Sequence, residues 1–153
     1  RVGNAAQSQV QNDSYGSIVL AAAQMFYDRR LPNRGDINLF RRLEKLGEKA
    51  AALAFEPDAS IWEFRGRKSI HTHSSALCWA ACDRLAKIAL TLGRGERAQH
   101  WRAEAERIRA GIFEGAWNAK LGAFAATFGG ADTDASLLLL QEIGLVPAAD
   151  PRF

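Results

Sequence analysis

Long hydrophobic runs are missing from this chain of 153 residues. No apolar segment approaches the roughly 18 residues that a membrane-spanning helix requires, and the run from Leu137 to Leu140 is only four leucines long. The residues from Arg1 onward also lack the basic, apolar and small-residue order of a secretory signal peptide. We therefore expect a protein that does not enter a membrane and that resides in the cytoplasm.

Cysteine is scarce, with only Cys78 and Cys82 in the chain. Their spacing places them on one face of a helix and matches neither a zinc site nor a disulfide framework. We expect both to be small buried side chains. Hydrophobic residues make up 48% and charged residues 24% of the chain, which is typical of a folded globular protein. At this length the composition predicts a single segment over residues 1–153.

A large excess of charge of either sign is missing too. The 20 Lys and Arg against 17 Asp and Glu leave a net charge of +3. The positive excess raises the hypothesis of nucleic-acid binding, but the arginines are dispersed and many lie beside acids, as Arg97 does beside Glu96. We therefore expect no nucleic-acid partner, and a basic nucleic-acid binder is the weakest alternative.

Helical periodicity is present in five segments, and none shows a long two-residue alternation, so the chain is predicted to be all-α. The third segment is apolar on two faces, which predicts deep burial, and the tight joint after it favours an antiparallel fourth helix. The predicted helices run from a cap at Asp13 or Ser14 to near Arg30, from a cap at Asp36 towards Pro57, from about Ser74 to Leu92, from after the break at Gly93 and Gly95 through Trp101 to Ile112, and from a cap at Asp132 or Thr133 to Ile143.

A connection of nearly twenty residues, from Phe55 to His73, separates the second and third predicted helices. Loops of this length in a compact domain are usually functional or mobile. Within it, Glu63 follows Trp62. A carboxyl group beside an indole in a partly apolar loop can act as a general acid, because burial favours its protonated form. The same pair also fits a solvated glutamate beside a packed tryptophan, so these residues alone leave both interpretations open.

His71 and His73 form a His-x-His pair, which on a strand would place both rings on one face and could begin a metal site. No third and fourth ligands follow at a suitable spacing, so we expect no metal and no cofactor. Glycine-rich phosphate loops and the Gly-x-Ser-x-Gly turn of hydrolases are absent from the sequence. Nucleotide chemistry and hydrolysis by a serine triad are therefore unsupported.

Four blocks of the sequence resemble glycoside hydrolase family 15, the bacterial glucoamylase, glucodextranase and trehalase-like enzymes. They occur in the family's order and span nearly the whole chain, which is more specific than any one block. The blocks are residues 1–7 with 11–16, residues 60–66 around Trp62 and Glu63, residues 72–74 with Cys78-Trp79 and Asp83-Arg84, and residues 134–140 with Gly144 and Pro147.

The resemblance implies a catalytic domain of the (α/α)6 toroid type, in which inner and outer helices alternate and the site lies at one end. Five helices are less than half of that toroid. It also implies that Glu63 is the general acid that protonates the glycosidic oxygen of an α-glucoside, while a second carboxylate activates water with inversion. That base lies downstream of these blocks in the family. The chain is therefore expected to be an incomplete part of the catalytic domain and inactive alone.

The same resemblance makes Trp62, Arg65, Asp13 and Tyr15 candidates for lining the substrate pocket, each of which could equally be structural. Ser75 stands where family members often carry Lys, which bears on substrate preference and on activity.

A second departure from the family is Phe64, which follows the acid where fungal relatives place a second Glu. The linkage cleaved, and the choice between trehalase, glucoamylase and glucodextranase activity, stay open. If the fragment folds alone, its inner helices would expose apolar faces, which favours self-association. The alternative from another class is a non-catalytic helical interaction module, in which Trp62 and Glu63 only pack.

Overall fold

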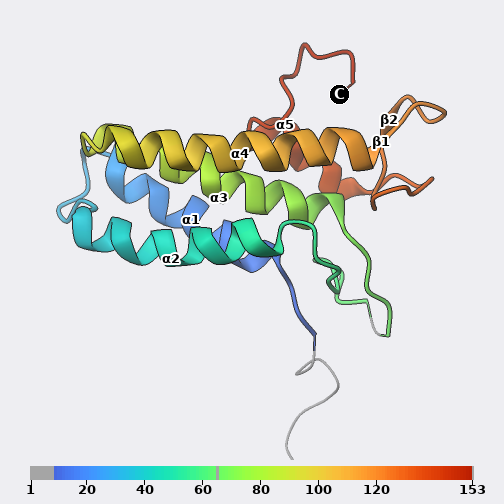
Figure 1. The fold of residues 1–153 in the computed structure, drawn as a ribbon, viewed down its shortest axis with the longest axis horizontal. Coiled ribbons are helices and arrows are strands. Elements are labelled where there is room, and N and C mark those ends of the chain that lie inside the picture. The colour runs from blue at the N-terminus through green and yellow to red at the C-terminus, as the bar shows by residue number, and fades with distance from the viewer. Residues whose placement is uncertain (1–8, 65, 153) are drawn as a thin grey trace, which may run out of the picture.

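A computed structural model describes residues 9–64 and 66–152 of the chain (Figure 1). Within these residues, long helices dominate and the only sheet is a two-stranded antiparallel hairpin, which confirms the predicted all-α class. None of these helices is long and apolar enough to cross a membrane. The elements in chain order are α1 (Asp13–Tyr27), α2 (Ile37–Leu53), α3 (Thr72–Thr91), α4 (Gly95–Ala116), β1 (Trp117–Asn118), β2 (Ala123–Phe124), the 3₁₀ helix η2 (Ala135–Leu138) and α5 (Leu139–Glu142).

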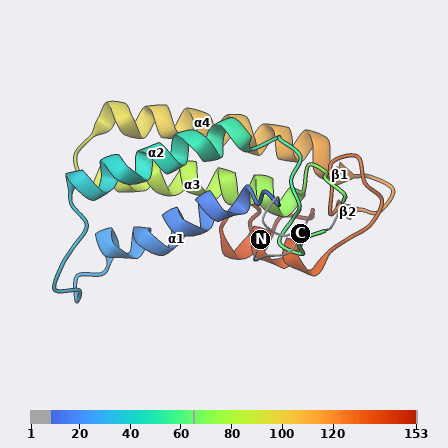
Figure 2. The same cartoon turned by 90° about the horizontal axis from the view of Figure 1, so that it is seen from below.

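The four long helices lie side by side, with α3 in the middle (Figures 1 and 2). Helix α3 contacts α1, α2, α4, η2 and α5. Helices α1 and α3 run in one direction and α2 and α4 in the other, so α4 is antiparallel to α3 as predicted. The loop between α2 and α3, the hairpin and the segment before η2 all lie at one end of the bundle, on the right in Figure 1. The candidate site lies among these loops.

Two helix starts test the predicted caps. The side chain of Asp36 accepts hydrogen bonds from the backbone N–H groups of Asn38 and Leu39 at 3.0 and 2.8 Å, so the predicted cap of α2 is confirmed. The predicted cap of α1 is wrong. Asn12 precedes the helix without a side-chain cap hydrogen bond, and Asp13 is the first helical residue.

The first and third helices also differ from the prediction in where they end or begin. Helix α1 stops at Tyr27 rather than near Arg30 because Asp28 turns to an extended backbone, and its carboxylate accepts a hydrogen bond from the Arg30 backbone N–H at 2.9 Å. Helix α3 begins at Thr72, before the predicted Ser74. The Thr72 hydroxyl donates to the carbonyl of Ala125 at 2.6 Å, which fixes this start against the segment after the hairpin.

The last helical segment also differs from the prediction. Its cap is Asp134, whose side chain accepts from the Ser136 backbone N–H at 2.8 Å, rather than Asp132 or Thr133. The first turn is 3₁₀, and only Leu139–Glu142 is α-helical. The 3₁₀ turn gives this segment the tighter winding that short helical pieces often adopt.

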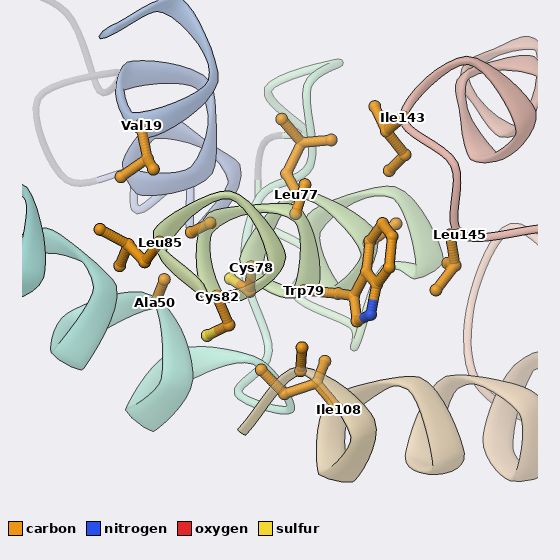
Figure 3. Packing of buried hydrophobic residues seen from close by; sticks show 14 of the residues in the cluster. Val19, Ala50, Leu77, Cys78, Trp79, Cys82, Leu85, Ile108, Ile143 and Leu145 are labelled. Atoms are coloured by element: carbon orange, nitrogen blue, oxygen red, sulfur yellow. The ribbon is translucent and has the colours of Figure 1, made fainter. Parts of the chain in front are cut away.

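The core is built around α3, as its two apolar faces predicted, and fifteen of its 20 residues are buried. Figure 3 shows Leu77, Trp79 and Leu85 of this helix among side chains from the other elements. Cys78 and Cys82 are buried and free, which confirms the expectation for them. Burial raises the pKa of both thiols, that of Cys82 to about 12.

Helix α1 approaches α3 closely at Gly16. A Cβ atom at this position would lie 2.1 Å from the carbonyl oxygen of Leu77, so only glycine fits without a shift of the backbone. This close approach sets α1, which begins with Asp13, against α3, whose first turn contains His73.

Candidate active site

The loop between α2 and α3 folds back on itself at Asp58 and Ser69, which form an antiparallel bridge through the Asp58 N–H to the Ser69 carbonyl at 3.0 Å. Within the loop the N–H of Phe64 donates to the carbonyl of Ala59 at 2.8 Å. This backbone network makes the segment an ordered turn that presents the Trp62-Glu63 pair.

Ser60 and Glu63 both adopt the left-handed backbone region, with φ of 65° and 53°. Residues other than glycine rarely adopt it, at a cost of the order of 1–3 kcal/mol each, and such strain tends to occur at functional sites. The Glu63 N–H donates to the carbonyl of Ser60 at 3.0 Å. The two strained residues therefore belong to one hydrogen-bonded turn.

A cavity of about 340 Å³ lies beside this turn, between the α2–α3 loop and the segment before η2. The indole Nε1 of Trp62 donates to the Asp134 carboxylate at 2.8 Å, which joins the two walls of the cavity. The cavity combines aromatic rings with acidic, basic and hydroxyl groups. Its lining residues are Ser60, Trp62, Phe64, Arg67, Ser69, His71, His73, Ala126, Thr127, Asp132, Thr133, Asp134 and Ser136.

Asp134 is the carboxylate that caps η2 and binds Trp62. Partial burial works to raise its pKa, but hydrogen bonds from Ser136 and Trp62 and the nearby His73 work in the other direction, and the pKa is lowered. The cavity therefore holds an ionised carboxylate, which can accept hydrogen bonds from a polar ligand.

Phe64 forms a second aromatic feature of the cavity. Its ring is stacked on that of His71 with centroids 5.9 Å apart, and the guanidinium of Arg67 lies 5.1 Å from the Phe64 ring centroid. This cation–π contact and the stacked imidazole keep the ring in place at the cavity wall. Phe64, Arg67 and His71 therefore form one packed part of the cavity wall.

His73, which lines the cavity, and Asp13 are both buried, and the charge of each influences the pKa of the other. Burial lowers the pKa of His73, with the charges of Asp13, Asp134 and Asp58 working against this and that of His71 reinforcing it. Burial raises the pKa of Asp13, with the charge of His73 working against this. The Nδ1 atom of His73 and the Oδ1 atom of Asp13 have no hydrogen-bond partner among the described residues. For both groups, burial shifts the pKa in the direction that disfavours the charged form.

Because burial lowers the pKa of His73, we expect the free energy of unfolding to decrease, in part through this residue, as the pH falls from about 7 to about 5. A lowered pKa means that, as the pH falls through the ordinary histidine value of 6.5, the unfolded chain binds a proton that folded His73 does not bind. His73→Gln removes this group and should flatten the pH dependence of the unfolding free energy, measured by urea denaturation. His100→Gln, at an exposed position of α4, is the control and should leave it unchanged. Equal pH dependence in the unmodified protein and in both variants would contradict the assignment of this effect to His73.

The predicted site residues lie at different depths. Trp62 lines the cavity with 53% of its surface exposed, and Glu63 is exposed on the same turn but is not among the lining residues. Tyr15 is half-buried and packs against the core, and Asp13 is buried; neither is among the lining residues of the cavity. Arg65 lies outside the described residues.

Sequence reasoning did not assign Asp134, His73 or Arg67 to a pocket. Asp134 and His73 both lie within blocks that carry the family resemblance, which is a usable signal, and the His-x-His pattern suggested a metal ligand as the only role for His73. Among the described residues, no group of three or more His, Cys, Asp or Glu side chains could hold a metal ion. Ser75 is buried, and its hydroxyl donates to the Ala54 carbonyl at 2.6 Å, which fixes the end of α2 against the start of α3.

Comparison with known proteins defines the class. The model of glycosyl hydrolases family 15 matches residues 1–153, and the chain belongs to this family. The helical bundle is consistent with a part of the family's helical toroid, as the resemblance implied. A search of solved structures finds no significant match.

The similar curated proteins are trehalases. The chain is 38% identical over 152 residues to the trehalase of Mycobacterium tuberculosis, and the match covers 99% of this chain and 22% of the relative. It is 33% identical to the trehalase of Thermoplasma volcanium, with 100% and 24% covered, and 36% identical to that of Mycolicibacterium smegmatis, with 99% and 22% covered. The chain thus spans about a quarter of the length of these relatives.

Proposed function

We propose that the chain supplies the general acid, Glu63, of an inverting glycoside hydrolase whose substrate is an α-glucoside, with trehalose the first candidate. Membership of family 15 and the trehalase names of the relatives support the class and the substrate. The observation that carries the role of Glu63 is its strained backbone on the turn that also holds Trp62 at the cavity. An exposed carboxyl next to a polar, aromatic cavity can reach a sugar bound there.

The proposed reaction transfers a proton from the Glu63 carboxyl to the glycosidic oxygen while the bond from the anomeric carbon to that oxygen breaks. A second carboxylate takes a proton from water, and the water oxygen bonds to the anomeric carbon from the opposite face. The leaving sugar keeps the glycosidic oxygen and its own configuration, and the glucose that water attacks is released as the β anomer. The two carboxyl groups of inverting enzymes lie about 6.5–9.5 Å apart, which admits the water.

The cavity residues have a proposed part in binding. The exposed indole of Trp62 offers an apolar face to a sugar ring, while the ionised Asp134 and the guanidinium of Arg67 can bind hydroxyl groups. Asp13 and Tyr15 do not line the cavity, so we assign them to the packing of α1 rather than to contact with the sugar. Hydrogen bonds from Trp62 and Ser136 already occupy Asp134, so we assign it to holding the cavity walls together rather than to activating water.

The test is a glucose-release assay on trehalose, maltose and isomalto-oligosaccharides, with the anomer identified by NMR. We expect the full-length protein to release one β-glucose and one α-glucose from each trehalose, and the 153-residue chain alone to release none, because a single carboxyl leaves water unactivated. Initial release of α-glucose alone from trehalose would contradict inversion, and activity of the chain alone would contradict the need for a distant base. Activity in neither would favour the non-catalytic helical interaction module.

A further inference from the structure

We propose that Asp58 is a positioning residue that holds the 58–64 turn, and with it Glu63, in the place from which the proton is donated. The inference rests on the proposed role of Glu63. It concerns a residue that contacts no substrate and acts only through the turn.

Asp58 is completely buried, and both of its carboxylate oxygens accept hydrogen bonds. Oδ2 accepts from the backbone N–H of Asn12 at 2.9 Å and from the hydroxyl of Ser74 at 2.7 Å, and Oδ1 accepts from the backbone N–H of Ser60 at 3.1 Å. Asn12 precedes α1 and Ser74 lies in the first turn of α3. One carboxylate therefore joins two helix starts to the turn.

The three partners all donate, which explains the residue type. A carboxylate has two acceptor oxygens and can accept from all three, whereas the amide of Asn replaces one oxygen with a donor. In Asp58→Asn that donor would face an N–H or O–H group in a buried place, and an unsatisfied buried polar group is costly. The substitution keeps the shape of the side chain and disturbs the hydrogen bonds.

The hydrogen bonds continue from Asp58 to Glu63. The carbonyl of Ser60, whose N–H binds Asp58, accepts from the side chain of Gln11 at 3.1 Å and from the Glu63 N–H at 3.0 Å. The carbonyl of Glu63 accepts from the side chain of Gln9 at 2.7 Å. The left-handed conformations of Ser60 and Glu63 persist only if their surroundings hold them. Asp58 is the buried end of this network, so its loss should release the turn.

A buried carboxylate can also act only by stabilising the fold, and Glu44 provides the matched comparison. It is buried in α2 and accepts from Trp101 Nε1 at 2.8 Å and from Arg97 Nε at 2.7 Å. These contacts join α2 to α4 near the start of α4, at the opposite end of the bundle from the candidate site (Figure 1). Glu44→Gln therefore measures what the loss of a buried charge does without a change at the turn.

The experiment compares Asp58→Asn, Ser74→Ala and Glu44→Gln in the full-length protein on two substrates, trehalose and α-D-glucosyl fluoride. Fluoride leaves as the anion and needs no proton from an acid, whereas the sugar leaving group of trehalose does. A misplaced catalytic group can lower the rate by roughly 100-fold, so we expect Asp58→Asn to lose about that factor in kcat/KM on trehalose and only a few-fold on the fluoride. Ser74→Ala, which removes one of the three donors, should show a smaller selective loss. Glu44→Gln should show none.

Equal losses of kcat/KM on the two substrates in Asp58→Asn and Ser74→Ala would overturn the inference. A selective loss on trehalose in Glu44→Gln would overturn it as well. An unmodified protein that hydrolyses neither substrate would instead overturn the proposed function. Hydrogen exchange then decides the structural part, since it needs no activity. Faster exchange at the amides of Ser60, Glu63 and Phe64 in Asp58→Asn, but not in Glu44→Gln, would support the proposal that Asp58 holds the turn in place. Unchanged exchange would contradict it.

Discussion

Replacing Glu63 with Gln is expected to lower kcat on trehalose by about 1,000-fold in the full-length protein, within the 10²–10⁴ range of general acid catalysis. The amide cannot donate a proton to the glycosidic oxygen, while its size and its exposed place on the turn keep the fold unchanged. Glucose release measures the loss, and circular dichroism checks the fold. The matched control is Glu56→Gln, another exposed carboxyl on the same loop, which should retain full activity.

The same variant separates proton donation from sugar binding. If Glu63 donates the proton, Glu63→Gln should retain most of the hydrolysis of α-D-glucosyl fluoride, because fluoride departs unprotonated. A residue that only binds the sugar would lose both activities together. Unchanged hydrolysis of trehalose would exclude the acid role and favour the helical interaction module.

Gly16→Ala should lower the free energy of unfolding by about 3 kcal/mol, which is at the upper end of the usual cost of overpacking. The new Cβ would lie 2.1 Å from the Leu77 carbonyl oxygen, and a backbone atom in the central helix cannot move away cheaply. Urea denaturation followed by circular dichroism measures the change.

The control for this substitution is Gly95→Ala at the start of α4. A Cβ there meets nothing within 4 Å, so the unfolding free energy should change by no more than about 0.5 kcal/mol. If the two alanine variants unfold alike, the close approach of α1 and α3 does not limit stability. If Gly16→Ala is destabilising as expected, it should also move Asp13 relative to His73, because these residues lie on the two helices that it separates.

The local signals in the sequence predicted the helices well. Asp36 capped its helix because the carboxylate needs only the N–H groups two and three residues later, and the apolar stripes of α3 already indicated a helix surrounded by others. The error at the start of α3 occurred where distant partners decide the outcome. Thr72 begins α3 because Ala125 and Ala126, more than fifty residues later, accept its hydroxyl and its N–H.

The candidate site was predictable in part for the same reason. The Trp62-Glu63 pair was found from its own neighbourhood, and the family match supports the resemblance that singled it out. The pairing of Trp62 with Asp134, 72 residues later, has no signature in either segment. The same holds for Asp58, whose donors come from residues 12, 60 and 74.

The hydrogen bond from Trp62 to Asp134 has a consequence for how the protein is made. A ribosome adds roughly 5–20 residues per second, so several seconds separate the synthesis of these two residues. Helices α1 to α4 depend on local contacts and can form during that interval, whereas the cavity lacks one wall until residues 126–136 have left the ribosome. We therefore expect the nascent chain to have its helices before it has a site, with the Trp62-Glu63 turn unanchored on one side until Asp134 arrives.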